Sequence, residues 1–275
     1  MADGAGGWRL GLVGLGSMGS AMLRGWLRRG ADALPFVLPV TVCEADQARL
    51  GAFELACPGV VAATSSPAAV ARDVDVVIVA VKPHDVAAVL AGMASELTPD
   101  KTVVSIAAGV RMEDMREAMG TGAALFRVMP NQAVSVGQGV ISLAGESAAR
   151  GERLAGLERM LALLGYVEVL PESQFNAVTA LAGSAPAFLA LVMQGLEDGG
   201  VRVGMPRATA RSMVRQTVLG TAALMVEEEL TSRELADRVT SPGGTTIAGL
   251  AVLEDCAVRG AMLRAVEAAD ERSRR

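Results

Sequence analysis

An apolar segment that leads into a glycine-rich turn constrains the fold of this chain more than any other feature. Residues 8–13 read Trp-Arg-Leu-Gly-Leu-Val, and Gly14-Leu15-Gly16-Ser17-Met18-Gly19 follows them directly. Residues 17–29 then carry apolar side chains at the spacing of a helix. This order of strand, turn and helix opens a βαβ unit, in which glycines let a pyrophosphate approach the N–H groups at the positive end of the helix. Because the motif stands in this context, we interpret it as a dinucleotide-binding turn rather than a purely structural one.

The alternation of strand and helix patterns continues through the first 170 residues. Further strands are predicted at residues 40–44, 75–81, 102–107, 124–129, 139–143 and 167–170, with helices at 85–97, 112–119 and 147–164. The run from Val76 to Val81 is apolar and mostly β-branched, as expected of a parallel strand that is covered on both faces. We therefore predict an α/β fold in which residues 1–170 form a Rossmann-like, doubly wound parallel sheet that binds NAD(P).

Strand patterns stop after Leu170, and Pro171 marks the predicted domain boundary. A long helix is predicted from Pro206 to about Glu228, and Thr231-Ser232-Arg233-Glu234 has the pattern of a capping box that begins the next helix. Residues 171–275 are thus expected to form an all-α second domain, with the charged end at 270–275 frayed. Because only 3% of the residues are aromatic, the core must consist of aliphatic side chains and methionine.

Charge and cysteine content argue against several classes of protein. The net charge is −5 and no basic run occurs, which argues against nucleic acid as a partner. Cys43, Cys57 and Cys256 have neither metal-ligand spacing nor the even number of a disulfide set, so we predict no metal and a cytoplasmic location. No N-terminal signal pattern is recognised. Residues 180–196 are apolar but contain glycine, proline and glutamine, which favours a buried helix over a membrane span.

An acidic residue, Glu44, ends the second predicted strand. At this position a carboxylate can accept hydrogen bonds from both ribose hydroxyls of the adenosine and would repel a 2′-phosphate, which favours NADH. In the alternative, Glu44 only caps the strand, and Arg49 is left to meet the phosphate of NADPH. The cofactor is therefore NADPH or NADH, with Glu44 favouring NADH.

The third strand ends in Ala80-Val81-Lys82-Pro83, on the edge of the sheet where the cofactor would lie. We place this loop near the nicotinamide ribose or the pyrophosphate. In the alternative, Lys82 is only a charged residue on the surface. The only histidine, His84, follows a proline in this loop. Such a residue is more often solvated or capping than a general base.

A second loop, Ser241-Pro242-Gly243-Gly244-Thr245-Thr246, concentrates hydroxyl groups and glycines just before a helical segment. It can present several N–H groups to a carboxylate and a hydroxyl to a neighbouring nitrogen. Glu229, near the end of the preceding helix, could orient these groups. In the alternative it belongs to the solvated face formed by three consecutive glutamates.

These motifs together resemble the pyrroline-5-carboxylate reductases, in order and along nearly the whole chain. The loop Val239-Thr240-Ser241-Pro242-Gly243-Gly244-Thr245-Thr246-Ile247-Ala248-Gly249-Leu250, followed by Leu253-Glu254, is similar to the family's C-terminal signature. Further similar segments are Ala80-Val81-Lys82-Pro83, Ala107-Ala108-Gly109-Val110, Met129-Pro130-Asn131, Gly183-Ser184-Ala185-Pro186-Ala187-Phe188, Asp198-Gly199-Gly200-Val201 and Gly204-Met205-Pro206-Arg207. Two departures occur: Gly183-Ser184-Ala185-Pro186-Ala187-Phe188 replaces Gly-Ser-Gly-Pro-Ala-Tyr, and Glu44 stands where NADPH-preferring members tend to have small hydroxyls.

The resemblance implies reduction of 1-pyrroline-5-carboxylate to L-proline by NAD(P)H, in a homodimer or higher oligomer whose helical domains interlock and whose active site is shared. The implied catalytic residues are Thr246, beside the substrate nitrogen, with Glu229 and Ser241. The implied substrate-binding residues are Val239, Ser241, Gly243, Gly244, Thr245 and Thr246. The implied cofactor-binding residues are Gly14, Gly16, Ser17, Met18, Gly19, Glu44, Ala80, Val81, Lys82, Pro83, Ala108 and Gly109.

Two rival interpretations remain from the residues. A β-hydroxyacid dehydrogenase has a similar glycine turn and a helical second domain, but its chemistry relies on a lysine in that domain, and no lysine follows Lys101. A non-catalytic nucleotide sensor would use the Rossmann part for binding and the helices for protein contacts. Such a sensor has no need for the hydroxyl-rich loop.

Overall fold

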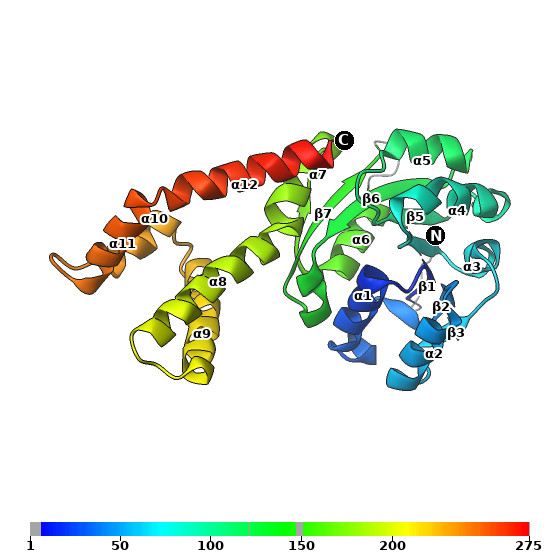
Figure 1. Ribbon diagram of the computed structural model, residues 1–275. Coiled ribbons are helices and arrows are strands. Elements are labelled where there is room, and N and C mark those ends of the chain that lie inside the picture. Colours follow the sequence, from blue (N-terminus) through cyan, green and yellow to red (C-terminus); the bar gives the residue numbers. More distant parts are fainter. Residues whose placement is uncertain (1–6, 121, 147–150, 275) are drawn as a thin grey trace. The chain divides into compact units, whose positions relative to one another are not determined.

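The structure is a computed structural model that describes residues 7–120, 122–146 and 151–274 (Figure 1). Two compact units are formed. Met1–Gly183 and Ser273–Arg275 make up the N-terminal unit, and Ser184–Arg272 make up the helical unit. The sequence pattern placed the domain boundary earlier, at residue 170. That the first part binds the cofactor and the second part binds the substrate stays a prediction.

The N-terminal unit contains one eight-stranded sheet in the order β3-β2-β1-β4-β5-β6-β7-β8. Its strands are β1 (Trp8–Val13), β2 (Phe36–Cys43), β3 (Val61–Ala63), β4 (Val76–Val79), β5 (Thr102–Ser105), β6 (Ala124–Pro130), β7 (Gly139–Gly145) and β8 (Gly165–Val169). Its α-helices are α1 (Ser17–Leu27), α2 (Gln47–Ala56), α3 (Pro67–Asp73), α4 (Val86–Met93), α5 (Met112–Met119), α6 (Glu152–Ala162) and α7 (Phe175–Val178). The predicted Rossmann-like α/β fold is confirmed.

Apolar strands in the middle of this sheet are buried on both faces. In β4, Ile78 belongs to the same core as Trp26 of α1, whereas its neighbour Val77 belongs to the core that contains Leu90 of α4. Successive side chains of a strand point to opposite faces, so each face needs apolar residues of its own. This explains why β4 reads as an unbroken apolar run instead of an alternating one. Trp26 is further fixed by its Nε1, which donates to the carbonyl of Met160 at 2.8 Å.

The sheet departs from the predicted all-parallel arrangement at one pair of strands. β6 and β7 are antiparallel, while the other neighbouring strands are parallel. Residues 131–138 connect the two, and this segment is shorter than the dozen or so residues that a parallel crossover requires. The short edge strand β3 was not predicted, because its apolar run, Val60 to Ala63, is only four residues long and half of it is alanine. Of the predicted helix at 147–164, residues 147–150 lie outside the described residues, and α6 begins at Glu152.

The helical unit confirms the predicted absence of strands after the sheet. It contains α8 (Ala185–Arg202), α9 (Arg207–Glu227), α10 (Ser232–Arg238) and α11 (Thr245–Asp255), followed by α12 (Val258–Ser273). The predicted capping box is present: the amide of Glu234 donates to Thr231 Oγ1 at 3.3 Å, and the amide of Thr231 donates to Glu234 Oε2 at 2.8 Å. Residues 270–275 were predicted to be frayed. This is wrong for residues 270–273, which are helical because α12 continues to Ser273.

The helices of this unit bury very little of their apolar surface within the chain. Of residues 184–272, all of which the structure describes, Ala210 alone is buried. The exposed large apolar side chains are Leu189, Leu191, Val192, Leu196, Val203, Met213, Leu219, Leu224, Val226, Val239, Ile247, Val252, Leu253 and Leu263. So large an apolar surface marks a site of contact with another surface.

The apolar segment at 180–196 was predicted to be a buried helix, and within the single chain this is wrong for α8, which has no buried residue. Residues 172–202 have a mean hydropathy of 1.6 in their most apolar window and are long enough to cross a bilayer, with 11% of that window buried. Length and composition alone do not separate a membrane span from a helix that another protein covers.

Candidate active site

The carboxyl ends of the central strands form the edge of the sheet at which the predicted cofactor residues gather. β2 and β3 lie on one side of β1, and β4 and β5 lie on the other, so the strand order reverses between β1 and β4. Backbone hydrogen bonds connect the carboxyl ends of β1, β2 and β4. The amide of Gly14 donates to the carbonyl of Cys43, and the amide of Ala80 donates to the carbonyl of Val13, both at 2.8 Å. In open α/β sheets, ligands bind outside the carboxyl ends of the strands at such a switch point.

Two glycines of the turn after β1 are required by the fold itself. Gly14 has a φ of +97°, and a Cβ there would lie 2.7 Å from the carbonyl oxygen of Ala80. A Cβ on Gly19 would lie 2.4 Å from the carbonyl oxygen of Gly14. Both positions therefore exclude a side chain because strand, turn and helix are packed closely.

Gly16 has no such structural reason to be glycine. Its φ is −65°, and a Cβ built on it meets nothing within 4 Å. It is the N-cap of α1, and no side chain caps that helix. The missing side chain leaves open space beside the positive end of α1, which fits the close approach of a pyrophosphate.

The other predicted cofactor residues share this edge. Ala80, Val81, Lys82 and Pro83 follow β4, and Ala108 and Gly109 follow β5. Lys82, Ala108 and Gly109 are exposed, and Gly109 has a φ of +77°. His84 is exposed as well, with its Nε2 3.4 Å from Asp85 Oδ2, which agrees with a solvated residue.

Glu44 lies at this edge too, but its side chain is buried. Glu44 Oε2 accepts from the amide of Leu15 at 2.5 Å, and Oε1 accepts from the amide of Asp46 at 2.9 Å and from Arg49 Nη1 at 3.0 Å. The carboxylate therefore links the end of β2 directly to the glycine turn. Burial, followed by the charge of Glu44, raises the pKa of the adjacent Cys43 thiol, which keeps that thiol protonated at neutral pH.

In the helical unit, the predicted substrate loop forms a tight turn ahead of α11. The amide of Gly244 donates to the carbonyl of Ser241 at 3.0 Å, with Pro242 and Gly243 between them. Gly243 has a φ of +67°. Proline at the second position and a glycine of positive φ at the third are the residues that a type II turn requires. Gly244 then acts as the N-cap of α11 without a side-chain cap.

The hydroxyl groups of this loop have no partners among the described residues. Ser241, Thr245 and Thr246 make no side-chain hydrogen bond there, whereas the neighbouring Thr240 donates from Oγ1 to the carbonyl of Ala236 at 2.6 Å. The first N–H groups of a helix have no intrahelical acceptor. The loop thus offers an uncapped helix N-terminus together with free hydroxyls, a combination suited to a carboxylate ligand.

Glu229 stands in an unusual backbone conformation just after α9. Its φ is +53°, and the amide of Leu230 donates to the carbonyl of Met225 at 2.9 Å. This is the hydrogen-bond pattern of a Schellman motif, whose left-handed position is usually glycine. A side chain held there costs about 1–2 kcal/mol. Such strain is often retained where the side chain has a function.

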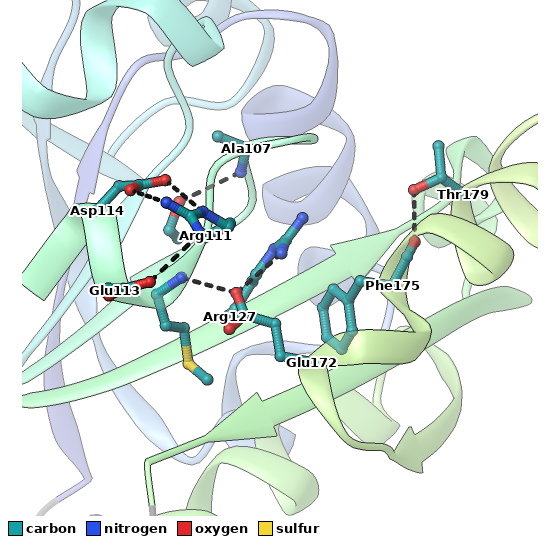
Figure 2. A network of polar contacts seen from close by, with 10 residues as sticks. Ala107, Arg111, Glu113, Asp114, Arg127, Glu172, Phe175 and Thr179 are labelled. Carbon is teal, nitrogen blue, oxygen red and sulfur yellow. Dashed lines mark hydrogen bonds and ion pairs between the residues drawn. The ribbon is translucent and has the colours of Figure 1, made fainter. Parts of the chain in front are cut away.

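Sequence reasoning missed a polar network near the carboxyl end of β5 and the middle of β6 (Figure 2). Arg127 on β6 is buried, with Nη1 2.9 Å from Glu172 Oε1 and its guanidinium 4.9 Å from the centre of the Phe175 ring. Glu172 Oε1 also accepts from the amide of Met112, at the start of α5, at 2.7 Å. The network holds the segment after β8 against the sheet. The sequence signal of this network is an arginine within an otherwise apolar strand.

No group of three or more histidine, cysteine or acidic side chains suited to a metal ion occurs in the described part of the chain.

Of the two lysines, Lys101 is buried, and its Nζ donates to the carbonyls of Ala71, Arg72 and Val74 at 2.5–2.9 Å. Lys101 therefore has a structural role at the end of α3.

The doubly wound sheet, the open space at Gly16 and the helical second unit define a dehydrogenase-type oxidoreductase that uses NAD(P)H. Residues 9–109 match the family described as NADP oxidoreductase coenzyme F420-dependent, and residues 172–275 match pyrroline-5-carboxylate reductase dimerisation. The chain belongs to the pyrroline-5-carboxylate reductase family, as its motifs predicted, since curated relatives of that name align with it over 97% of its length.

Two of these relatives and two solved structures illustrate the similarity. The reductase of Methanosarcina acetivorans is 36% identical, covering 97% of each chain, and that of Glycine max is 38% identical, covering 97% of this chain and 95% of the relative. The structure of the Coxiella burnetii reductase has a TM-score of 0.86 at 30% identity, covering 97% of each chain. The Plasmodium falciparum reductase with NADP bound has a TM-score of 0.85 at 27% identity, covering 98% of each chain.

Proposed function

We propose that this chain reduces 1-pyrroline-5-carboxylate to L-proline, and that the loop 241–246 holds the substrate. The observation that carries this proposal is the uncapped N-terminus of α11 beside the free hydroxyls of Ser241, Thr245 and Thr246. A carboxylate is the ligand that such a helix end attracts. Ser241, Gly243, Gly244 and Thr245 bind the substrate carboxylate, and Val239 lines the ring pocket.

The reaction asks little acid–base chemistry of the protein. A protonated cyclic imine is already an electrophile, and the bound nicotinamide supplies the hydride. The new C–H bond forms at the carbon of the C=N bond, and the π electrons of that bond become the lone pair of the ring nitrogen. Thr246 hydrogen-bonds this nitrogen, and the loop N–H groups hold the carboxylate. Catalysis then rests on proximity and orientation, which explains how a chain with one histidine performs it.

The cofactor is held at the carboxyl edge of the sheet by the glycine turn and the loops after β2, β4 and β5. Gly14, Gly16, Ser17, Met18 and Gly19 meet the pyrophosphate. Ala80, Val81, Lys82 and Pro83 lie near the nicotinamide ribose or the pyrophosphate. Ala108 and Gly109 also contact the cofactor, and Glu44 lies toward the adenosine ribose. The open space beside Gly16 supports this assignment.

The apolar faces of the helical unit are proposed to pair with those of a second copy of the chain. Homo-oligomers are implied by the dimerisation family that residues 172–275 match. The near absence of buried residues in this unit supports an interlocked pairing that also completes the substrate pocket. We place the oligomer in the cytoplasm, since its three cysteines are free thiols.

The function is tested by following the absorbance of NADH and of NADPH while the purified protein is mixed with 1-pyrroline-5-carboxylate. We expect oxidation of the reduced cofactor with the imine. A 3-hydroxy acid with oxidised cofactor serves as the control and should give no reduction. Tight cofactor binding without imine reduction would instead favour the nucleotide sensor.

Exchange of Glu229 for glycine separates its function from its backbone strain. Glu229→Gly should raise the free energy of unfolding by up to about 1 kcal/mol, because it relieves the left-handed conformation. It should also lower kcat/KM about 10- to 100-fold, because misplacement of a catalytic group can cost about 10²-fold. Thermal unfolding and steady-state kinetics provide the two readouts.

Ala257→Gly is the matched control, since Ala257 has a φ of +52° after α11 and lies outside the proposed site. It should stabilise the protein similarly without changing kcat/KM. If Glu229→Gly had the kinetics of the wild type, Glu229 would have no role in the reaction and would belong only to the solvated face of the three consecutive glutamates.

A further inference from the structure

We propose that Arg49, and not Glu44, reads the 2′ position of the adenosine ribose, so that the chain binds the 2′-phosphorylated cofactor although an acidic residue ends β2. The inference rests on the cofactor site proposed above. It reverses the preference for NADH that the sequence position of Glu44 suggested.

The burial of Glu44 is the first step of the argument. Its side chain is 7% exposed, and three N–H donors of the chain already occupy its two oxygens. One of them is the guanidinium of Arg49, which balances the negative charge. A carboxylate that selects against a 2′-phosphate must face the ribose with its charge uncompensated. The charge of Glu44 is compensated, and its carboxylate braces the glycine turn through the amide of Leu15.

The exposure of Arg49 is the second step. Its side chain is 48% exposed and lies in the first turn of α2, directly after the end of β2. Glu44 connects it to the glycine turn, so the guanidinium lies at the edge where the adenosine half of a dinucleotide is expected. Its contacts to Glu44 and Asp46 leave further N–H donors of its five for a phosphate. The planar fork of a guanidinium matches the geometry of a phosphate group.

Asp46 limits the affinity of this arrangement. Asp46 Oδ2 lies 3.1 Å from Arg49 Nη2, and its side chain is 46% exposed. Its negative charge is therefore close to any phosphate that Arg49 binds. Asp46 also caps α2, since Oδ1 accepts from the amide of Arg49 at 3.1 Å. Asparagine caps helices as well as aspartate does, so Asp46→Asn removes the charge and keeps the cap.

The test measures the binding of NADP⁺ and NAD⁺ to the full chain by calorimetry, together with adenosine 2′,5′-bisphosphate and 5′-AMP. For Arg49→Gln, we expect the ratio of NADP⁺ to NAD⁺ affinity to fall about 10- to 100-fold, as for the loss of a hydrogen bond to a charged group. For Asp46→Asn, the same ratio should rise several-fold. Arg72→Gln, which removes another exposed arginine that is paired with an acid, Glu96, should leave the ratio unchanged.

The outcomes separate this inference from the function itself, because no imine is present in the binding experiment. Equal loss of both dinucleotides in Arg49→Gln would overturn the inference and show that Arg49 only supports the turn. An unchanged or lower ratio in Asp46→Asn would overturn it as well, even if Arg49→Gln failed to fold. A wild-type protein that binds the two cofactors with the expected ratios but does not reduce the imine would contradict the proposed function alone.

Discussion

Thr246→Ala is expected to lower kcat about 100-fold while leaving the dissociation constant of the reduced cofactor nearly unchanged. The hydroxyl of Thr246 makes no hydrogen bond within the described residues, so its loss removes nothing from the fold. In the proposed site it is the group that hydrogen-bonds the reacting nitrogen. Removal of one oriented donor from such a position costs about 10²- to 10³-fold in turnover. Single-turnover kinetics and cofactor fluorescence measure the two quantities separately.

Two further variants make this result specific. Thr246→Ser keeps the hydroxyl and should recover most of the turnover. Thr240→Ala removes a hydroxyl from the same segment, but one that is bonded to the carbonyl of Ala236. It should reduce the free energy of unfolding by about 1 kcal/mol without a comparable loss of turnover. An unchanged kcat in Thr246→Ala would exclude Thr246 from the reaction.

Gly16→Ala is expected to weaken the binding of both dinucleotides about 10- to 100-fold without unfolding the protein. A Cβ at this position meets no atom of the chain within 4 Å, and its φ of −65° suits any residue. The methyl group would instead occupy the space next to the uncapped end of α1 and hold the pyrophosphate away from the N–H groups. Each hydrogen bond to a charged group that is lost costs about 1.5–3 kcal/mol.

The neighbouring glycine provides the contrast. Gly19→Ala places its Cβ 2.4 Å from the carbonyl oxygen of Gly14, so it should lower the melting temperature as well as the affinity. Gly92→Ala on α4 adds a methyl group in open space far along the chain from the turn and should leave cofactor binding unchanged. If Gly16→Ala bound dinucleotides as tightly as the wild type, the cofactor could not lie against this turn.

The elements that sequence reasoning predicted best are those whose cause is local. The strand at 8–13 and the helix at 112–119 have the predicted bounds, because period and turn residues determine them. The antiparallel pairing of β6 and β7 had a signal in the short connection at 131–138. The three-residue strand β3 had only the short apolar run from Val60 to Ala63 as a signal, and it is held by its pairing with β2.

The environment of the site residues was less predictable, because it depends on residues that are distant in the sequence. Glu44 was placed correctly at the end of its strand, but its bond to Leu15 crosses 29 positions. The partner of Arg127 lies 45 positions away. The left-handed conformation of Glu229 had no sequence signal at all, because glycine is the residue expected there.

The helical unit has one more consequence, for how the protein is made. A segment in which Ala210 alone is buried gains little free energy from folding by itself. In the proposed pairing these helices are completed only when two chains meet, so folding of this part is expected to be second-order in protein concentration. A newly synthesised chain would have a finished sheet and unfinished helices until a second chain arrives. With that pairing, the yield of folded helical units is expected to rise with the concentration of newly made chains.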